Sequence, residues 1–257
     1  MTDLSAAQVR FLAAKKKHRR TVTCSRLLIF VTFVLLWEGA AALHIIDSFI
    51  FSSPSRIALC FYQMMKDRSL PVHMGITLFE TLISFLLVII CALAVTILLW
   101  FSRRLSETLE PYLVVLNSLP KSALAPLLIV WLGSDYKTII VTGMSVAIFG
   151  SILNLYTCFA AVDPEKIKLI YALGGKKYQV MTKVILPSNI PALFSLMKVN
   201  IGLCLVGVVI GEFIGAREGL GYLIIYGSQV FRLDWVMMSI VLLCMIAMLL
   251  YGLLGLI

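Results

Sequence analysis

Six stretches of about 20 residues, each nearly free of charged side chains, recur along this chain of 257 residues. A helix needs about 20 residues to cross the roughly 30 Å hydrocarbon core of a bilayer. The stretches that reach this length are residues 27–46, 77–101, 111–132, 138–159, 190–214 and 235–256. The sequence therefore predicts an all-α fold, a polytopic transmembrane bundle of six helices.

The composition excludes the common classes of soluble protein. Apolar residues make up 61% of the chain and charged residues only 14%, whereas soluble domains have about 45–50% and about 25%. So few charges cannot cover a surface that faces water. A soluble enzyme, a soluble nucleic-acid-binding protein and a disordered chain are excluded, although the net charge is +9. A nucleic-acid-binding arm at residues 15–20 is the less favoured interpretation of the basic N-terminus.

The basic residues also predict the orientation. Seven Lys and Arg precede residue 27, two stand at 103–104 and five lie between 166 and 183. With the N-terminus inside, these fourteen are cytoplasmic and only six are external, as the positive-inside rule requires. We expect a multi-pass protein of the cell (plasma or inner) membrane with both termini in the cytoplasm. Residues 1–26 form a basic cytoplasmic segment and residues 27–257 a membrane domain whose core begins at about residue 72.

Both ends of the chain leave an alternative open. The basic start followed by an apolar run could be a cleaved signal peptide, but the run is long enough to span the membrane, so we expect it to be retained. The chain ends in the apolar residues 253–257 without a basic tail. A very short or missing C-terminal tail is therefore an open alternative.

No pattern of residues indicates a catalytic or metal centre. The six cysteines contain no C-x-x-C pair, and the three histidines share no helical spacing, so a metal site is not expected. The chain also lacks the phosphate-binding pattern G-x4-GK[ST]. We therefore expect a protein that is not an enzyme and binds no cofactor itself.

The cytoplasmic loop at residues 160–189 differs from its surroundings. Asp163, Pro164 and Glu165 provide an N-cap, a proline at the first helical position and an acid in the first turn. Apolar residues then recur at helical spacing until Gly174, which ends the helix. A second short amphipathic helix follows and ends at Pro187. Two such helices could lie on the lipid interface or dock into a groove on a soluble partner.

The residues of this loop resemble a known signature. Gly174, nine further residues and then Val184-Ile185-Leu186-Pro187 are similar to EAA-x3-G-x9-I-x-L-P, the signature of the membrane subunits of type I ABC importers. The resemblance covers most of the chain from Trp37 onward. Further segments resemble the nitrate/sulfonate/taurine subfamily, namely Leu119-Pro120, Ala125-Pro126-Leu127, Trp131-Leu132-Gly133, Gly211-Glu212-Phe213 and Gly219-Leu220-Gly221-Tyr222-Leu223.

The resemblance implies a MetI-like permease fold and a set of partners. Two copies of the chain, expected as a homodimer, would form the pathway for a small solute such as a sulfonate, a nitrate-like ion or a vitamin precursor. A cytoplasmic ATPase subunit would bind ATP and Mg, and an extracytoplasmic solute-binding protein would deliver the solute. The residues expected to couple to the ATPase are Asp163, Glu165, Lys168, Ile170, Tyr171, Ala172, Gly174, Leu186 and Pro187.

One departure from the signature reverses a charge. Where the family has Glu-Ala-Ala, this chain reads Lys168-Leu169-Ile170. Either the cognate ATPase carries a compensating acid at this point, or docking depends on the apolar contacts and on Gly174.

Five charged residues fall within the predicted spans, where a charge at the centre costs about 2.5–3.5 kcal/mol on insertion scales. They are Glu38, Glu80, Lys121, Lys198 and Glu212. We expect Glu80 and Lys198 to reach water at the membrane faces, and Lys121 and Glu212 to line the translocation pathway or its gate.

Small residues at Gly207, Gly211 and Gly215 form a stripe for close helix packing, either within one subunit or between two. Two other function classes remain as alternatives. An ion-coupled secondary transporter or channel would work without an ATPase, and a membrane scaffold would not transport at all.

Overall fold

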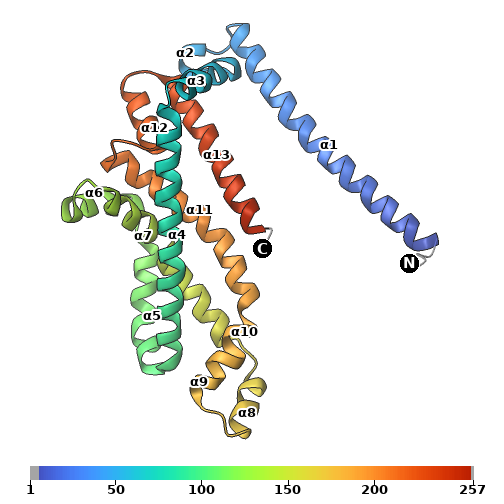
Figure 1. The fold of residues 1–257 in the computed structure, drawn as a ribbon, viewed down its shortest axis with the longest axis vertical. Helices are drawn as coiled ribbons and strands as arrows, with labels where there is room; N and C mark the ends of the chain where they lie inside the picture. Colours follow the sequence, from blue (N-terminus) through green and yellow to red (C-terminus); the bar gives the residue numbers. More distant parts are fainter. Residues whose placement is uncertain (1–5, 256–257) are drawn as a thin grey trace.

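The structure is a computed structural model that describes residues 6–255, with side chains described from residue 15 onward. Within these residues the chain forms helices joined by short turns (Figure 1). The long helices are α1 (Ala6–Ala42), α4 (Ser69–Phe101), α5 (Arg103–Ser118), α6 (Lys121–Leu132), α7 (Tyr136–Ala160), α11 (Ile190–Gly215) and α13 (Leu233–Gly255). The shorter ones are α2 (Ser48–Phe51), α3 (Pro54–Lys66), α8 (Pro164–Ala172), α9 (Lys177–Val180), the π-helix η1 (Met181–Ile185), α10 (Leu186–Ser188) and α12 (Leu220–Gln229).

Five helices are long and apolar enough to cross a membrane, and a bent pair makes a sixth span. The five are α1 from Lys15 onward, α4, α7, α11 and α13, and the pair is α5 with α6. The predicted all-α bundle of six spans is therefore confirmed. The second span begins at Ser69, eight residues earlier than predicted. Leu256, the last residue of the sixth predicted span, lies outside the described residues.

The third span differs most from its predicted form, because it is two helices and not one continuous helix. The axes of α5 and α6 are bent by 97° at the break between them. Leu119, at the break, has extended backbone angles. This conformation is the one favoured before a proline, and Pro120 follows it.

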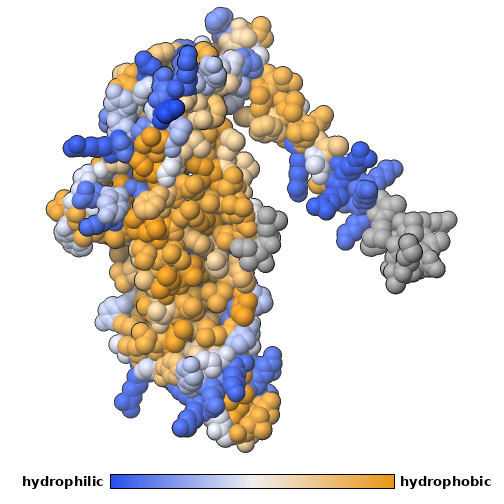
Figure 2. All heavy atoms as spheres, viewed as in Figure 1, coloured by the Kyte–Doolittle hydropathy of each residue, from blue (hydrophilic) through white to orange (hydrophobic). Residues whose placement is uncertain are grey.

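A belt of apolar side chains surrounds the middle of the bundle, and polar residues gather toward both ends (Figure 2). Large apolar residues are widely exposed on the membrane-spanning helices, for example Val130 of α6 at 80% and Met248 of α13 at 68%. A soluble protein would not leave so continuous an apolar surface in water. The belt is the surface that a bilayer would cover.

The centre of the bundle is formed by α4, α7 and α11, which pack against one another. The glycine stripe explains their close approach. A β-carbon at Gly207 would lie 2.8 Å from the Cα of Gly143, and one at Gly211 would lie 3.1 Å from the Cα of Ile139. Both neighbours belong to α7, so the stripe packs within one chain, which was one of the two alternatives.

Helix α1 stands apart from the rest of the bundle and contacts it mainly through α2 and α3 (Figure 1). It runs without a break past residue 26, where the basic segment was expected to give way to the first span. At its other end Glu38 accepts hydrogen bonds from the backbone N–H and the hydroxyl of Ser55, at 3.0 and 2.8 Å. Glu38 thus binds the first turn of α3.

Candidate functional site

The first helix of the 160–189 loop forms as its residues predict. The side chain of Asp163 accepts a hydrogen bond from the N–H of Glu165 at 2.9 Å, and Pro164 occupies the first turn. At the other end Gly174 has φ of +78°, the left-handed conformation that favours glycine. The N–H of Gly175 reaches back to the carbonyl of Ile170 at 2.8 Å, which closes the helix as a C-terminal cap does.

The second helix ends at Ser188, one residue after the predicted end at Pro187. Helix α9 continues into the π-helix η1 and then into α10, which contains Pro187. The N–H of Leu186 bonds to the carbonyl of Met181, five residues back, as in a π-turn. Pro187 therefore lies in the last turn of this helical segment, and Asn189 forms the turn that follows.

The loop packs onto the end of α4 through a small apolar core. Its buried members are Phe159, Val180, Met181 and Ile185, and Trp100, Phe101, Ile167 and Ile170 pack against them. Lys177 adds a polar link, because its Nζ donates a hydrogen bond to the carbonyl oxygen of Phe101 at 2.8 Å. The same Nζ lies 5.3 Å from the ring centre of Trp100 and 5.7 Å from that of Phe101. The lysine therefore supplies a positive charge at the C-terminus of α4, where it is favourable.

Other apolar side chains of the loop remain in the open. Leu169 is 59% exposed, Tyr171 47%, Leu173 76% and Tyr178 68%. We call these four residues the exposed loop face. They lie at the tip of the molecule beyond the apolar belt, where Figure 2 shows apolar atoms among strongly polar ones. Apolar groups gathered at a polar end are typical of a surface that binds a partner.

The predicted coupling residues divide between this surface and the core beneath it. Ile170 and Leu186 are half-buried, whereas the other seven are exposed (Asp163, Glu165, Lys168, Tyr171, Ala172, Gly174 and Pro187). Lys168, the residue that departs from the family signature, pairs with Glu165 one turn earlier at 3.2 Å. Both side chains are more than 70% exposed, so this pair contributes little to stability. It places a carboxylate next to the reversed charge.

At the opposite end of the bundle Glu212 is the centre of a buried hydrogen-bond network. The hydroxyl of Thr77 donates to its Oε1 at 2.6 Å, and the N–H of Gly221 donates to its Oε2 at 2.5 Å. Thr77 in turn accepts the N–H of Leu220 at 2.8 Å. The first N–H groups of α12 have no partners within their own helix, so α4 and α11 satisfy them.

This network explains the glycines of the Gly219-Leu220-Gly221 turn. A β-carbon at Gly221 would lie 2.7 Å from a carboxylate oxygen of Glu212, and one at Gly219 would also overlap that carboxylate. Gly219 has φ of +110°, a conformation that L side chains rarely adopt. The turn is therefore shaped to hold the carboxylate of Glu212.

Glu80 lies beside Glu212, which overturns the expectation that it reaches water at the membrane face. Only 1% of each residue is exposed, and the two carboxyl groups are within hydrogen-bonding reach. The pattern of α4 alone could not show this, because a glutamate at a buried helix–helix contact and one at a water-facing position look the same in the sequence.

Lys121 occupies the break between α5 and α6. Its Nζ donates hydrogen bonds to the carbonyls of Leu116 and Asn117 at 2.5 and 3.1 Å, and lies 5.3 Å from the ring centre of Phe149. It thus binds the free carbonyls at the end of α5. Among the described contacts, none joins Lys121 to Glu212.

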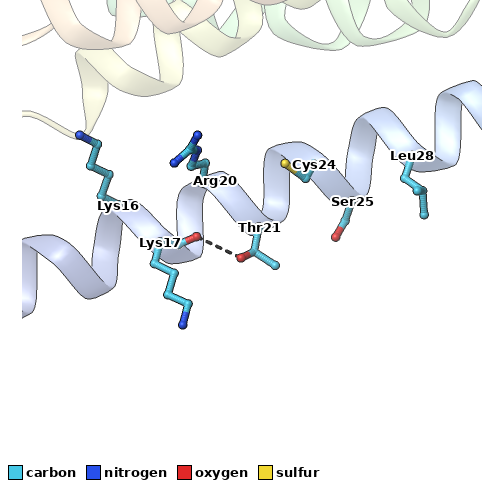
Figure 3. A pocket seen from close by; sticks show the side chains of 7 residues that line it. All are labelled: Lys16, Lys17, Arg20, Thr21, Cys24, Ser25 and Leu28. Atoms are coloured by element: carbon cyan, nitrogen blue, oxygen red, sulfur yellow. Dashed lines mark hydrogen bonds between the residues drawn. The ribbon is translucent and has the colours of Figure 1, made fainter.

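Two hollows in the surface differ in position and in character. One of about 510 Å³ lies beside Glu80 and is bordered by the first residues of α7 and by the turn that contains Arg217. The other, of about 860 Å³, runs along α1 alone. Figure 3 shows Lys16 and Arg20 on one side of that helix and Lys17 on the other, so this hollow is an open surface and not an enclosed site. Among the described residues, no three potential ligands converge as a metal centre would require.

Comparison with known proteins identifies the family. Residues 84–257 match the model of the family described as "Binding-protein-dependent transport system inner membrane component". A probable ABC transporter permease protein of Haemophilus influenzae is 29% identical over 88% of this chain and 91% of its own length. The putative aliphatic sulfonates transport permease protein SsuC of Bacillus subtilis is 28% identical over 84% and 79%.

The fold agrees with this assignment. A solved structure of the MetNI methionine ABC transporter in an inward-facing conformation aligns with a TM-score of 0.61 at 21% identity, over 70% of this chain and 90% of its own. At this identity the likeness supports the MetI-like fold alone. With the family model matched over most of the chain, the protein belongs to the binding-protein-dependent transport system inner membrane components, the permease subunits of ABC importers.

Proposed function

We propose that this chain forms the translocation pathway of an ATP-driven importer as one of two identical copies. The 163–187 loop lies in the cytoplasm and docks an ABC ATPase subunit, which binds ATP and Mg. Both termini are cytoplasmic, as the basic residues predict. A solute-binding protein delivers the solute at the opposite, external end, where α3 and α12 lie.

The observation that carries this proposal is the exposed loop face. The apolar side of the second loop helix is already buried in the chain's own core, through Val180, Met181 and Ile185. The residues that remain exposed therefore belong to the outer side of the loop and are not needed for its folding. An amphipathic helix that presents such a face can dock into a groove on a soluble protein.

The contacts beneath this face support a coupling role. Ile167 and Ile170 join the loop to the core that also holds Trp100 and Phe101 at the end of α4. A displacement of the loop by the ATPase would therefore act on a membrane-spanning helix. The ATPase can shift the transporter between two states only if it binds the loop differently in each of them.

For the solute we propose a small organic molecule, such as a sulfonate or another organic anion, or a vitamin precursor. The names of the relatives support this range. They include permeases for aliphatic sulfonates, formylaminopyrimidine and riboflavin. Within the pathway we propose Glu212 as a gate residue, because it holds the α11–α12 turn closed, and Lys121 as a pathway residue at the break between α5 and α6.

The test uses two substitutions to aspartate at positions of positive φ, placed at opposite ends of the bundle. Gly174 has φ of +78°, and no neighbouring atom lies within 4 Å of the point that a β-carbon would occupy, so Gly174→Asp causes no clash but adds a charge and strains the left-handed turn of the loop. Phe231 has φ of +56°, is 69% exposed and lies at the other end of the bundle, so Phe231→Asp is the control. We expect Gly174→Asp to abolish co-purification of the ABC ATPase subunit from membranes, and Phe231→Asp to retain it. Equal recovery of the ATPase with both variants would refute the proposal.

A further inference from the structure

Glu80 and Glu212, the buried pair near the start of α12, differ in the hydrogen bonds that their carboxyl oxygens accept. Glu212 receives a donor on each carboxylate oxygen, from Thr77 and from Gly221. Glu80 receives neither, and its Oε2 is buried without any hydrogen-bond partner. A buried polar atom without a partner is costly and calls for an explanation.

The charges around the pair give no counterion. In the part of the chain that the structure describes, no ion pair includes either glutamate. On α4, His73 faces the turn, and its Nδ1 accepts the N–H of Gly219 at 3.0 Å. Arg217 and Glu218 of the turn and Asp135 before α7 border the neighbouring hollow, and all three are exposed. Two carboxylates in contact, buried and without a cation between them, cannot both stay charged.

The surroundings of Glu80 and Glu212 indicate which of the two carries the negative charge and which holds the proton. Glu212 lies at the N-terminus of α12, where a negative charge is favoured, and both of its oxygens accept hydrogen bonds. Glu80 has no such donor. We propose that Glu80 and Glu212 form a proton-binding site, in which Glu80 holds the proton and donates it in a hydrogen bond to the carboxylate of Glu212.

The bound proton has a structural effect. It joins α4 to α11 directly below the turn that begins α12, and it leaves the pair with a single negative charge. Loss of the proton would place two like charges in contact and push α4 away from α11. The external end of the bundle is therefore held together most firmly when the site is loaded, and this holds whichever solute is carried.

The experiment measures the protonated carboxyl group itself. Infrared spectra of the chain in lipid nanodiscs are recorded for the wild type, for Glu80→Gln, and for Glu218→Gln as the control at the same end. We expect the C=O absorption of a protonated carboxylic acid at neutral pH in the wild type and in Glu218→Gln. It should be absent in Glu80→Gln, whose amide is neutral and keeps a donor for Glu212. An absorption that persists in Glu80→Gln, or that the wild type lacks, would overturn the proposal.

A second measurement follows stability against pH. Because the folded state binds a proton that the unfolded state releases, wild-type thermal stability should fall as the pH rises from neutral to alkaline values. The decline should be smaller in Glu80→Gln. If the thermal midpoint depended on the sodium concentration and not on the pH, the site would bind a metal cation instead of a proton. That result would refute the proposal. Should Glu80→Gln not fold, the wild-type absorption must still disappear on alkaline titration. Neither readout needs the ATPase or a solute, so failure here would leave the proposed import function intact.

Discussion

Replacement of Lys177 by methionine tests how firmly the 163–187 loop is held to the membrane helices. The substitution removes a hydrogen bond of 2.8 Å from a charged donor to the carbonyl of Phe101, and a cation near the rings of Trp100 and Phe101. A charged hydrogen bond contributes about 1.5–3 kcal/mol when buried, and a cation–π contact at an exposed site about 0.5–1 kcal/mol. Lys177 is exposed, so solvent screening lowers the combined effect to about 1 kcal/mol.

A loss of about 1 kcal/mol raises the population of the undocked loop about fivefold. Hydrogen–deuterium exchange of the chain in nanodiscs measures this population, because backbone amides of 163–187 exchange from the open state. We expect those amides to exchange about fivefold faster in Lys177→Met. Exchange at the far ends of α4 and α11 should not change.

Two further variants control for charge and for chemistry. Lys166→Met removes an equal charge from a residue whose side chain makes none of the described hydrogen bonds, and should leave the exchange of the loop unchanged. Lys177→Arg keeps a positive charge that can stack on an aromatic ring, and should lie between wild type and Lys177→Met. If Lys166→Met and Lys177→Met accelerated exchange equally, the net charge of the loop and not the contact with α4 would be responsible, and our reasoning would be wrong.

Two predictions concern packing and thiol chemistry. Gly207→Ala should lower the thermal midpoint clearly, because the added β-carbon would overlap the backbone of α7. Gly202→Ala is the control: no atom lies within 4 Å of its β-carbon position, so the midpoint should stay unchanged or rise. Equal midpoints for the two variants would argue against the close contact. Burial, with a smaller contribution from Asp234, raises the pKa of the Cys60 thiol. Because the thiolate is the reactive form, maleimide should modify Cys60 far more slowly than the exposed Cys24 at neutral pH, and the difference should narrow as the pH rises. Rapid modification of Cys60 in the folded protein at neutral pH would contradict its burial.

Much of the fold follows from features that act within a few residues. Span length and hydropathy predict the bundle, and the sequence Asp163-Pro164-Glu165 predicts the start of α8 because a cap, a first-turn proline and an acid all act locally. Gly174 marks the end of that helix for the same reason. These features need no information about distant neighbours.

The features that the sequence does not reveal depend on contacts between distant segments or on rare backbone forms. Glu80 is buried because Glu212, 132 positions later, lies against it, and no local pattern reports such a contact. Pro187 indicates a helix end because a proline normally stops an α-helix, and the segment does end at the next residue, but the π-helix η1 before it is a rare form that the sequence does not reveal. The link from Lys177 to Phe101 spans 76 positions, and a lysine in a basic loop gives no sign of it.

The span of α4 has a mechanical consequence. Its 33 residues extend about 50 Å at 1.5 Å each, and it is fastened near both ends, by Lys177 to the 163–187 loop and by Thr77 to the turn before α12. A stiff helix held in this way acts as a lever. If it tilts by a few degrees about one end, the other end moves by several ångström. A displacement of the 163–187 loop can thereby move the turn before α12 at the opposite end of the bundle in a single step. No series of rearrangements among the other membrane-spanning helices is needed.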